Sequence, residues 1–215
     1  MARILITSGP TRQYLDPVRY LTNGSSGRMG QALAAAALKR GHKVVVVSGP
    51  VAIDYPPQAE VRRVISTEEM LAACEELFPE CDGVIGAAAP CDYRPVRVAE
   101  QKIAKTGQPL LLQLVETPDI MATLGASKRK DQWLVGFALE TDDHRFRALT
   151  KLERKSCDLM VLNGPAAMDA FETQVEVIDR AGHVLAQLEG SKPKVAEGIL
   201  ELIETHLTGG RPRRG

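Results

Sequence analysis

The stretch Tyr20–Gly41, YLTNGSSGRMGQALAAAALKRG, joins a glycine-rich loop to an alanine- and leucine-rich segment. Residues 29–40 are predicted to be a helix, and Gly41 suits its end because glycine readily adopts the left-handed conformation found after helices. An apolar segment at 3–7 and a β-branched segment at 43–50 flank this stretch and are predicted strands. A strand, a helix and a strand in this order predict a parallel sheet.

The remaining segments extend the α/β pattern. The sequence predicts a Rossmann-like, mostly parallel, doubly wound sheet with a mixed C-terminal part, and a site at the carboxyl ends of its strands. A single domain is expected over 1–207, followed by a disordered basic tail at 208–215. Further strands are expected at 59–65, 81–89, 109–116, 132–140 and 158–163, a hairpin turning at 180–182, and helices at 66–78, 143–156, 192–207 and after Thr117, with Thr117 as the cap and Pro118 in the first turn.

Composition disfavours several classes of protein. The 215 residues include 27 Lys+Arg and 27 Asp+Glu, so a formal net charge of zero gives no reason to expect general affinity for nucleic acid or an anionic membrane. The start, MARILITSGP, lacks signal-peptide features and no apolar run reaches the roughly 20 residues of a membrane span, so a cytoplasmic protein is expected. The four cysteines form no C-x-x-C pair, which favours reduced, buried thiols.

The glycine loop departs from the dinucleotide-binding fingerprint in three ways. The first strand ends near Thr7, but the glycines begin only at Gly24. Their spacing is G-x-x-G-x-x-G, and Ser48 stands where an acidic residue would hold a ribose. An ordinary NAD site is therefore disfavoured. The helix start can bind an anion such as a substrate phosphate, close to Ser25 and Ser26, or the glycines can serve only helix–sheet packing.

The segment 8–23, between the first strand and the glycines, is expected to be a functional loop or an interface, because loops of this length in compact domains rarely serve only as connections. Asp16, Arg19 and Asn23 are its candidate residues, although each alone is more often a solvated surface group.

Other polar residues follow predicted strands. Asp92 comes after the strand at 81–89, where a carboxylate suits Mg²⁺ or a ribose hydroxyl, or simply begins a turn. Lys102 and Lys105 lie in a polar connection that can close over a triphosphate or remain a solvated loop.

Two lysines recur at helical spacing near the end of another strand. Lys151 and Lys155 lie four residues apart and repel each other unless an anion lies between them, although a solvated helix face is the simpler interpretation. Phe137 and Glu140 end the strand at 132–140, and Phe137 can face a ligand or the core.

Five segments occur in order along the chain. They are TSGPTRQYLDPVRYLTNGSSGRMG (7–30), AAAPCDYRP (87–95), TPDIMA (117–122), VGFALETDD (135–143) and KLERKSCDLMVLN (151–163). Together they resemble phosphopantothenate–cysteine ligase, the synthetase half of the bacterial bifunctional coenzyme A enzyme. The resemblance runs from about residue 4 to beyond residue 165. Nothing resembles the flavin-dependent decarboxylase half, so a stand-alone synthetase is expected.

The resemblance implies a two-step ligation. The carboxylate of 4′-phosphopantothenate attacks the α-phosphorus of the co-substrate CTP, releasing pyrophosphate and forming an acyl-cytidylate. The amine of L-cysteine then attacks the activated carbonyl, releasing CMP and forming 4′-phosphopantothenoyl-cysteine. Because the carboxylate and the triphosphate are both anionic, Mg²⁺ and lysines are expected to bring them together. The residues leave the choice between CTP and ATP open.

The resemblance also implies roles for individual residues. Asn23 steers the acyl-cytidylate carbonyl for attack by cysteine, Lys102 supplies positive charge during catalysis, and Asp92 is the metal ligand. Arg19 reaches the substrate from the neighbouring subunit, so a homodimer is expected. The substrate-binding set is Arg19, Asn23, Ser25, Ser26, Gly27, Ala88, Ala89 and Asp92, and the nucleotide-binding set is Gly86, Ala87, Ala88, Asp92, Lys102, Pro118, Asp119, Ile120, Met121, Phe137, Lys151 and Lys155.

Four positions depart from the family pattern. Pro90 and Cys91 replace a usual valine and alanine, and the proline removes a backbone donor. Ala104 replaces one lysine of the usual K-x-K-K segment, and Thr117 replaces the usual asparagine before Pro-Asp-Ile. None of the four is assigned to the chemistry.

Two other functions remain open. A nicotinamide-dependent oxidoreductase of the short-chain type needs a Tyr-x-x-x-Lys pair, and none of the four tyrosines has lysine four residues later. A non-catalytic nucleotide- or flavin-binding subunit would keep the fold but lose Asn23, Asp92 and Lys102, and all three are present.

Overall fold

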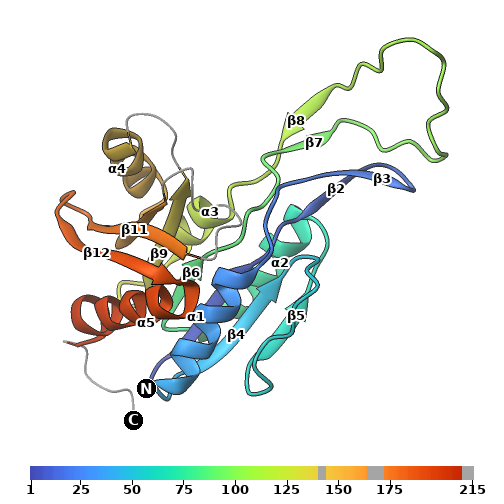
Figure 1. Ribbon diagram of the computed structural model, residues 1–215. Coiled ribbons are helices and arrows are strands. Elements are labelled where there is room, and N and C mark those ends of the chain that lie inside the picture. The colour runs from blue at the N-terminus through green and yellow to red at the C-terminus, as the bar shows by residue number, and fades with distance from the viewer. Residues whose placement is uncertain (140–143, 164–171, 210–215) are drawn as a thin grey trace.

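The computed structural model describes residues 1–139, 144–163 and 172–209, and an eight-stranded sheet lies at its centre (Figure 1). Six strands are parallel in the order β10-β9-β6-β1-β4-β5, and β11 and β12 add antiparallel at the β10 edge. The predicted sheet class, with its mixed C-terminal part, is confirmed. The strands are β1 (Arg3–Ser8), β4 (Lys43–Ser48), β5 (Glu60–Arg63), β6 (Gly83–Gly86), β9 (Trp133–Leu139), β10 (Leu159–Asn163), β11 (Glu172–Asp179) and β12 (Val184–Ser191).

Helices cover both faces of the sheet because the central strands are apolar on both sides. Ile4 and Ile6 of β1 pack with α1 and α5 on one face, whereas Leu5 packs with α2, α3 and α4 on the other. This is the doubly wound arrangement. The helices are α1 (Arg28–Lys39), α2 (Thr67–Leu77), α3 (Ile120–Ser127), α4 (His144–Arg154) and α5 (Lys192–Ile203), with short helical turns at η1 (Phe78–Glu80) and η3 (Glu204–Thr208).

An arm projects from this body, and Figure 1 shows its two hairpins extending together away from the sheet. The hairpins are β2 (Arg12–Asp16) with β3 (Arg19–Thr22) and β7 (Tyr93–Pro95) with β8 (Leu114–Glu116). We use "the arm" for these strands and the chain 96–113. The segment 8–23, expected as a loop, is thus mostly a hairpin. The sheet strand expected at 109–116 is wrong: only 114–116 pair, and they do so in the arm, because the leucines before them reach no covered sheet face.

The start of α3 differs from the sequence prediction. Thr117 is not its cap. The Asp119 carboxylate accepts the N–H of Ala122 at 3.1 Å and caps the helix. Thr117 is engaged elsewhere, because its hydroxyl donates to the Cys91 carbonyl at 2.6 Å.

All four cysteines are free and buried, as predicted. Burial raises the pKa of Cys74 to about 12, and it raises those of Cys81 and Cys157 to about 11. These thiols are neutral core side chains at ordinary pH. Within the described ranges, no helix is long and apolar enough to cross a membrane. The extent of one domain over 1–207 stays a prediction, and residues 210–215 of the expected tail lie outside the described residues.

Candidate functional site

A cavity of about 830 Å³ lies at the carboxyl ends of the parallel strands. Residues at the ends of β1, β6, β9 and β10 line it, with the glycine loop on one side and α4 on another. Open α/β sheets bind ligands at this edge. We call this cavity the main cleft. Its lining includes most of the predicted site: Asn23, Ser25, Ser26, Gly27, Gly86, Ala87, Ala88, Ala89, Asp92, Pro118, Asp119, Ile120, Met121, Phe137, Lys151 and Lys155.

The glycine loop packs closely against β1. Gly27 has φ +74°, which favours glycine, and its carbonyl accepts a hydrogen bond from the Ser8 hydroxyl at 3.2 Å. A Cβ on Gly30 would lie 2.1 Å from Ser8 Oγ. The glycines therefore do serve helix–sheet packing. The same loop leaves Ser25 and Ser26 lining the main cleft beside the start of α1, where the backbone amides of a helix favour an anion.

Asn23 is held by the segment that follows β6. Its side-chain amide donates to the Pro90 carbonyl at 2.9 Å and lies 3.4 Å from the Ala89 carbonyl. The N–H of Ala89 in turn donates to the Gly9 carbonyl at 2.9 Å. Two strand ends thus fix the position of Asn23. The Pro90 departure removes a backbone donor but keeps the carbonyl that Asn23 uses.

The Cys91 departure places a neutral thiol between the main cleft and the arm. The N–H of Cys91 donates to the Thr11 hydroxyl at 2.8 Å, and its thiol lies 3.4 Å from the Thr11 carbonyl. Burial raises the pKa of Cys91 and outweighs the opposing hydrogen bond from Thr11. In this structure the side chain packs against Thr11.

Cations at the end of α4 meet a carboxylate in the main cleft. Asp119 Oδ2 lies 3.2 Å from Lys155 Nζ and 2.9 Å from Arg154 Nη2. The spacing of Lys151 and Lys155 left a solvated helix face and a nearby anion open, and here Asp119 supplies negative charge to Lys155. A bound polyphosphate would compete with Asp119 for these cations.

Asp92 is an exposed carboxylate of the main cleft. In the part of the chain that the structure describes, no group of three or more His, Cys, Asp or Glu side chains could hold a metal ion. These donors do not fit a metal cage built by the protein alone. They do fit Mg²⁺ bound mainly through phosphate oxygens and water with one carboxylate, which is a common arrangement for this ion.

Arg19 and Lys102 do not line the main cleft of their own chain. The Arg19 guanidinium lies 3.0 Å from the Asp16 carboxylate and donates to the Ile103 carbonyl at 2.9 Å. Asp16 also accepts the N–H of Ile103 at 3.1 Å. The residue next to Lys102 is thereby fixed to the β2–β3 hairpin, so Arg19 and Lys102 belong to one unit in the arm.

Asp16 is fully buried at this contact. Burial alone raises its pKa, but the N–H groups of Val18, Ile103 and Arg19, with the Arg19 charge, outweigh that effect and lower the pKa below its usual range. The carboxylate therefore stabilises the arm above about pH 4, and this contribution is lost as the pH falls through the lowered value.

The sequence did not single out several polar residues of the main cleft, including Arg28, Arg154, Asn163 and Lys192. Asn163 ends β10, and its Oδ1 is buried with no hydrogen-bond partner in the described ranges. Asn163 ends a predicted strand, and this position could have identified it as a candidate site residue. Arg28 and Lys192 begin α1 and α5, and no sequence pattern brings those two helix starts together.

Comparison with known proteins extends over nearly the whole chain. The family model described as DNA/pantothenate metabolism flavoprotein C-terminal domain matches residues 1–207. A cysteine/cysteine sulfinic acid decarboxylase of an unknown prokaryotic organism is 42% identical over 208 residues, which are 94% of this chain and 58% of that protein. The coenzyme A biosynthesis bifunctional protein CoaBC of Haemophilus influenzae is 39% identical over 206 residues, 94% of this chain and 52% of that protein. The chain thus spans little more than half the length of these relatives.

A solved structure agrees with this relationship. The crystal structure of the C-terminal domain of coenzyme A biosynthesis bifunctional protein CoaBC matches with a TM-score of 0.81 and 37% identity, covering 96% of each chain. The family model and the relatives match almost the whole of this chain, and this protein belongs to the DNA/pantothenate metabolism flavoprotein C-terminal domain family.

Proposed function

We propose that this protein is a cytoplasmic ligase that joins 4′-phosphopantothenate to L-cysteine in coenzyme A biosynthesis. The observation that carries the proposal is the main cleft, in which Asn23, Asp92 and Lys155 share one cavity at the strand ends. The names of the CoaBC relatives support the same pathway.

The main cleft suits a reaction between two anions. The start of α1 favours a phosphate, and the cations at the end of α4 favour a second anion in the same cavity. Bringing a carboxylate against a triphosphate is then a matter of positioning and of neutralising charge. Asn23 contributes a neutral amide with two N–H donors. The amide donates to the Pro90 carbonyl at 2.9 Å and makes a longer contact of 3.4 Å with the Ala89 carbonyl. An oxyanion that develops when cysteine attacks would take the N–H of the longer contact.

CTP is the proposed nucleotide, and the acyl-cytidylate is the proposed intermediate. Lys151 and Lys155 bind the triphosphate, while the backbone around Ala88 and Pro118 meets the rest of the nucleotide. Mg²⁺, when bound with the nucleotide, neutralises phosphate charge. Asp92 is the residue that holds it there.

The arm supports a homodimer. Leu111 is 92% exposed, Leu110 57% and Val98 56%, which is a large apolar surface to leave in water. We propose that this surface packs against a second copy and brings Arg19 and Lys102 to the partner's main cleft. Arg19 donates a hydrogen bond to the carbonyl of Ile103, the residue next to Lys102. Arg19 and Lys102 would therefore reach the partner's main cleft together.

Pyrophosphate release tests the proposal. The protein is incubated with CTP or ATP, with and without 4′-phosphopantothenate. We expect release that requires 4′-phosphopantothenate and is faster with CTP, and we expect CMP and the amide product once L-cysteine is added. Release that is absent, or that does not depend on 4′-phosphopantothenate, contradicts the ligase function.

A nicotinamide-dependent oxidoreductase is less well supported. Ser48 ends β4 at the position where such enzymes hold a ribose with an acidic residue. Its hydroxyl donates to the Gly49 carbonyl at 2.8 Å and lies 2.9 Å from the Tyr55 hydroxyl, so Ser48 is a buried packing residue. Titration with NADPH is expected to give no saturable binding.

A further inference from the structure

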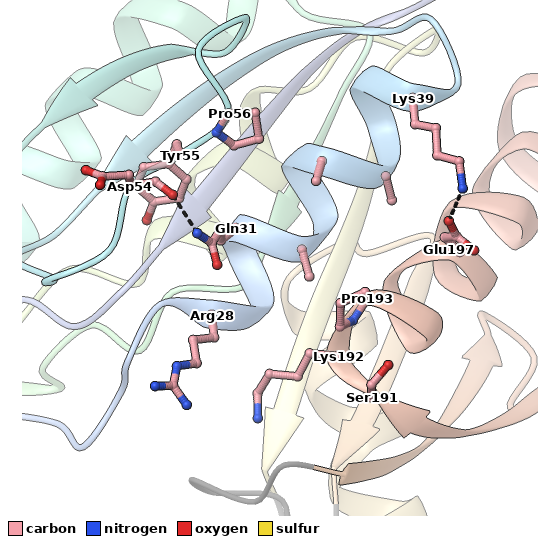
Figure 2. Close-up of a pocket in the computed structure, with 13 residues that line it drawn as sticks. Arg28, Gln31, Lys39, Asp54, Tyr55, Pro56, Ser191, Lys192, Pro193 and Glu197 are labelled. Atoms are coloured by element: carbon pink, nitrogen blue, oxygen red, sulfur yellow. Dashed lines mark hydrogen bonds and ion pairs between the residues drawn. The ribbon is translucent and has the colours of Figure 1, made fainter.

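A second cavity lies between α1 and α5, beside the main cleft. Its volume is about 620 Å³, and Figure 2 shows the side chains that line it. Its walls come from one side of α1, the first turns of α5 and the segment 54–56. We call it the α1–α5 groove. The proposed ligation makes no use of its apolar walls.

The middle of the groove is apolar. Ala32, Ala35 and Ala36 of α1 form its floor, and their small side chains leave open the space that larger residues would fill. Pro193 of α5 and the ring of Tyr55 form its sides. The Tyr55 hydroxyl is bonded to two buried serines at 2.8 and 2.9 Å, so only the ring is left to face a ligand.

One end of the groove is positively charged. Arg28 is the first residue of α1 and Lys192 is the first residue of α5, and Figure 2 shows both side chains at the same end of the groove. Within the described ranges, the Arg28 guanidinium has no hydrogen bond or ion pair. The positive ends of two helix dipoles add to these two charges.

The rest of the groove holds one ion pair, one hydrogen bond to the backbone and the exposed carboxylate of Asp54. Lys39 Nζ lies 2.6 Å from the Glu197 carboxylate, and the Gln31 side-chain amide donates to the Asp54 carbonyl at 2.5 Å. Figure 2 shows both contacts, on α1 beyond the end at which Arg28 lies. A ligand that complements this surface is therefore anionic at one end and apolar along its body.

We propose that the α1–α5 groove binds a phosphate monoester that carries a short hydrocarbon chain. The phosphate lies between Arg28 and Lys192, because two cations suit a dianion, and the chain lies on the alanines of α1. Both cations also line the main cleft, so the groove adjoins that site but has its own apolar wall. The proposal does not rest on the ligase function.

Calorimetry with simple probes tests the proposal on the full chain. The probes are hexyl phosphate, inorganic phosphate and 1-hexanol. We expect hexyl phosphate to bind at least tenfold more tightly than inorganic phosphate, because each methylene placed on an apolar surface adds affinity, and 1-hexanol to bind more weakly than hexyl phosphate. Equal affinity for hexyl phosphate and inorganic phosphate overturns the proposal, as does equal affinity for hexyl phosphate and 1-hexanol.

A matched pair of variants locates the probe. Ala35 is exposed on the floor of the groove, and Ala72 is exposed on α2, on the other face of the sheet. Ala35→Leu is expected to abolish the tenfold advantage of hexyl phosphate, whereas Ala72→Leu keeps it. An advantage that survives in Ala35→Leu means that the chain binds elsewhere and overturns the proposal. Pyrophosphate release by Ala35→Leu is expected to be unchanged, so this result and the test of the ligase function can fail separately.

Discussion

The main cleft and the arm both gather charged residues, but they arrange them in opposite ways. In the main cleft, Asp92 and Arg154 are exposed on a support of buried strands. In the arm, the Asp16 carboxylate is buried and fully bonded, while leucines such as Leu111 are exposed. Exposed polar groups on a rigid support are suited to binding a small ligand. Exposed apolar groups, next to polar groups that already have hydrogen-bond partners, are suited to contact with another protein. The comparison predicts different consequences for mutations in the two regions.

The largest effect is expected in the main cleft. Asn23→Asp replaces a neutral donor by a negative charge where an oxyanion develops, so amide formation should fall about 100-fold or more. The acyl-cytidylate should still form and accumulate. Quenched time points that quantify the acyl-cytidylate and the amide separately test this expectation. Full amide production would show that the role of Asn23 is misassigned.

A smaller effect is expected in the arm. Leu111→Ser should raise the dissociation constant of the dimer about tenfold or more, because burial of a leucine contributes roughly 1.5–3 kcal/mol. Sedimentation equilibrium measures this change. Ile65→Ser is the matched control, since Ile65 is also exposed but lies outside the arm. An unchanged dimer, or the same change in both variants, would mean that the arm does not carry the interface.

The sheet that supports the main cleft can be probed separately by alkaline pH. Burial raises the pKa of Cys74 to about 12, whereas an unfolded thiol ionises near 8.5. Ionisation then favours the unfolded state as the pH rises above about 9, and at pH 10 one such thiol should cost on the order of 1–2 kcal/mol of unfolding free energy. Urea unfolding at pH 7 and pH 10 measures the loss, which should be smaller by that amount in Cys74→Ala. Equal losses in both proteins would assign the alkaline sensitivity to other groups.

The smallest effect on stability is expected at the cations of α4. Arg154 is 64% exposed, so Arg154→Gln should change the unfolding free energy by less than about 1 kcal/mol. The same change should weaken nucleotide binding and reduce its dependence on salt, because a charge facing the ligand is lost. Lys128→Gln is the contrasting variant, since Lys128 is mostly buried, lies 2.8 Å from Asp158 and donates to the Ser156 carbonyl. It should destabilise the fold and leave nucleotide binding unchanged, and the reverse pattern would contradict the comparison.

The sheet and most of the main cleft could be predicted from the sequence because their signals are local. Apolar runs such as the one at 43–50 mark buried strands, and polar residues that follow them, such as Asp92, fall at one edge of a parallel sheet. Asn23 was predicted through the resemblance of its motif; it lines the main cleft, and the structure adds its bond to Pro90.

The arm could not be predicted because its conformation depends on contacts between residues that are far apart in the sequence. Arg19 and Ile103 meet only through folding, and neither neighbourhood has the alternating apolar pattern of a sheet strand. For the same reason, the sequence predicted that Lys102 contacts the nucleotide but could not show that Lys102 lies outside the main cleft of its own chain. The α1–α5 groove is also a product of packing, since alanines on a helix give no sign of an open space.

The bond between Asp16 and Ile103 joins parts of the chain that are 87 positions apart. Residues 104–112, just beyond it, are all exposed and invite proteolysis. A nick there would separate β7 from β8 in the covalent chain. The pairing of β7 with β8 and the hydrogen bond between Asp16 and Ile103 would still hold the two fragments together. The nicked protein should therefore run as one species in gel filtration and as two bands after denaturation, with the guanidinium of Arg19 still in position.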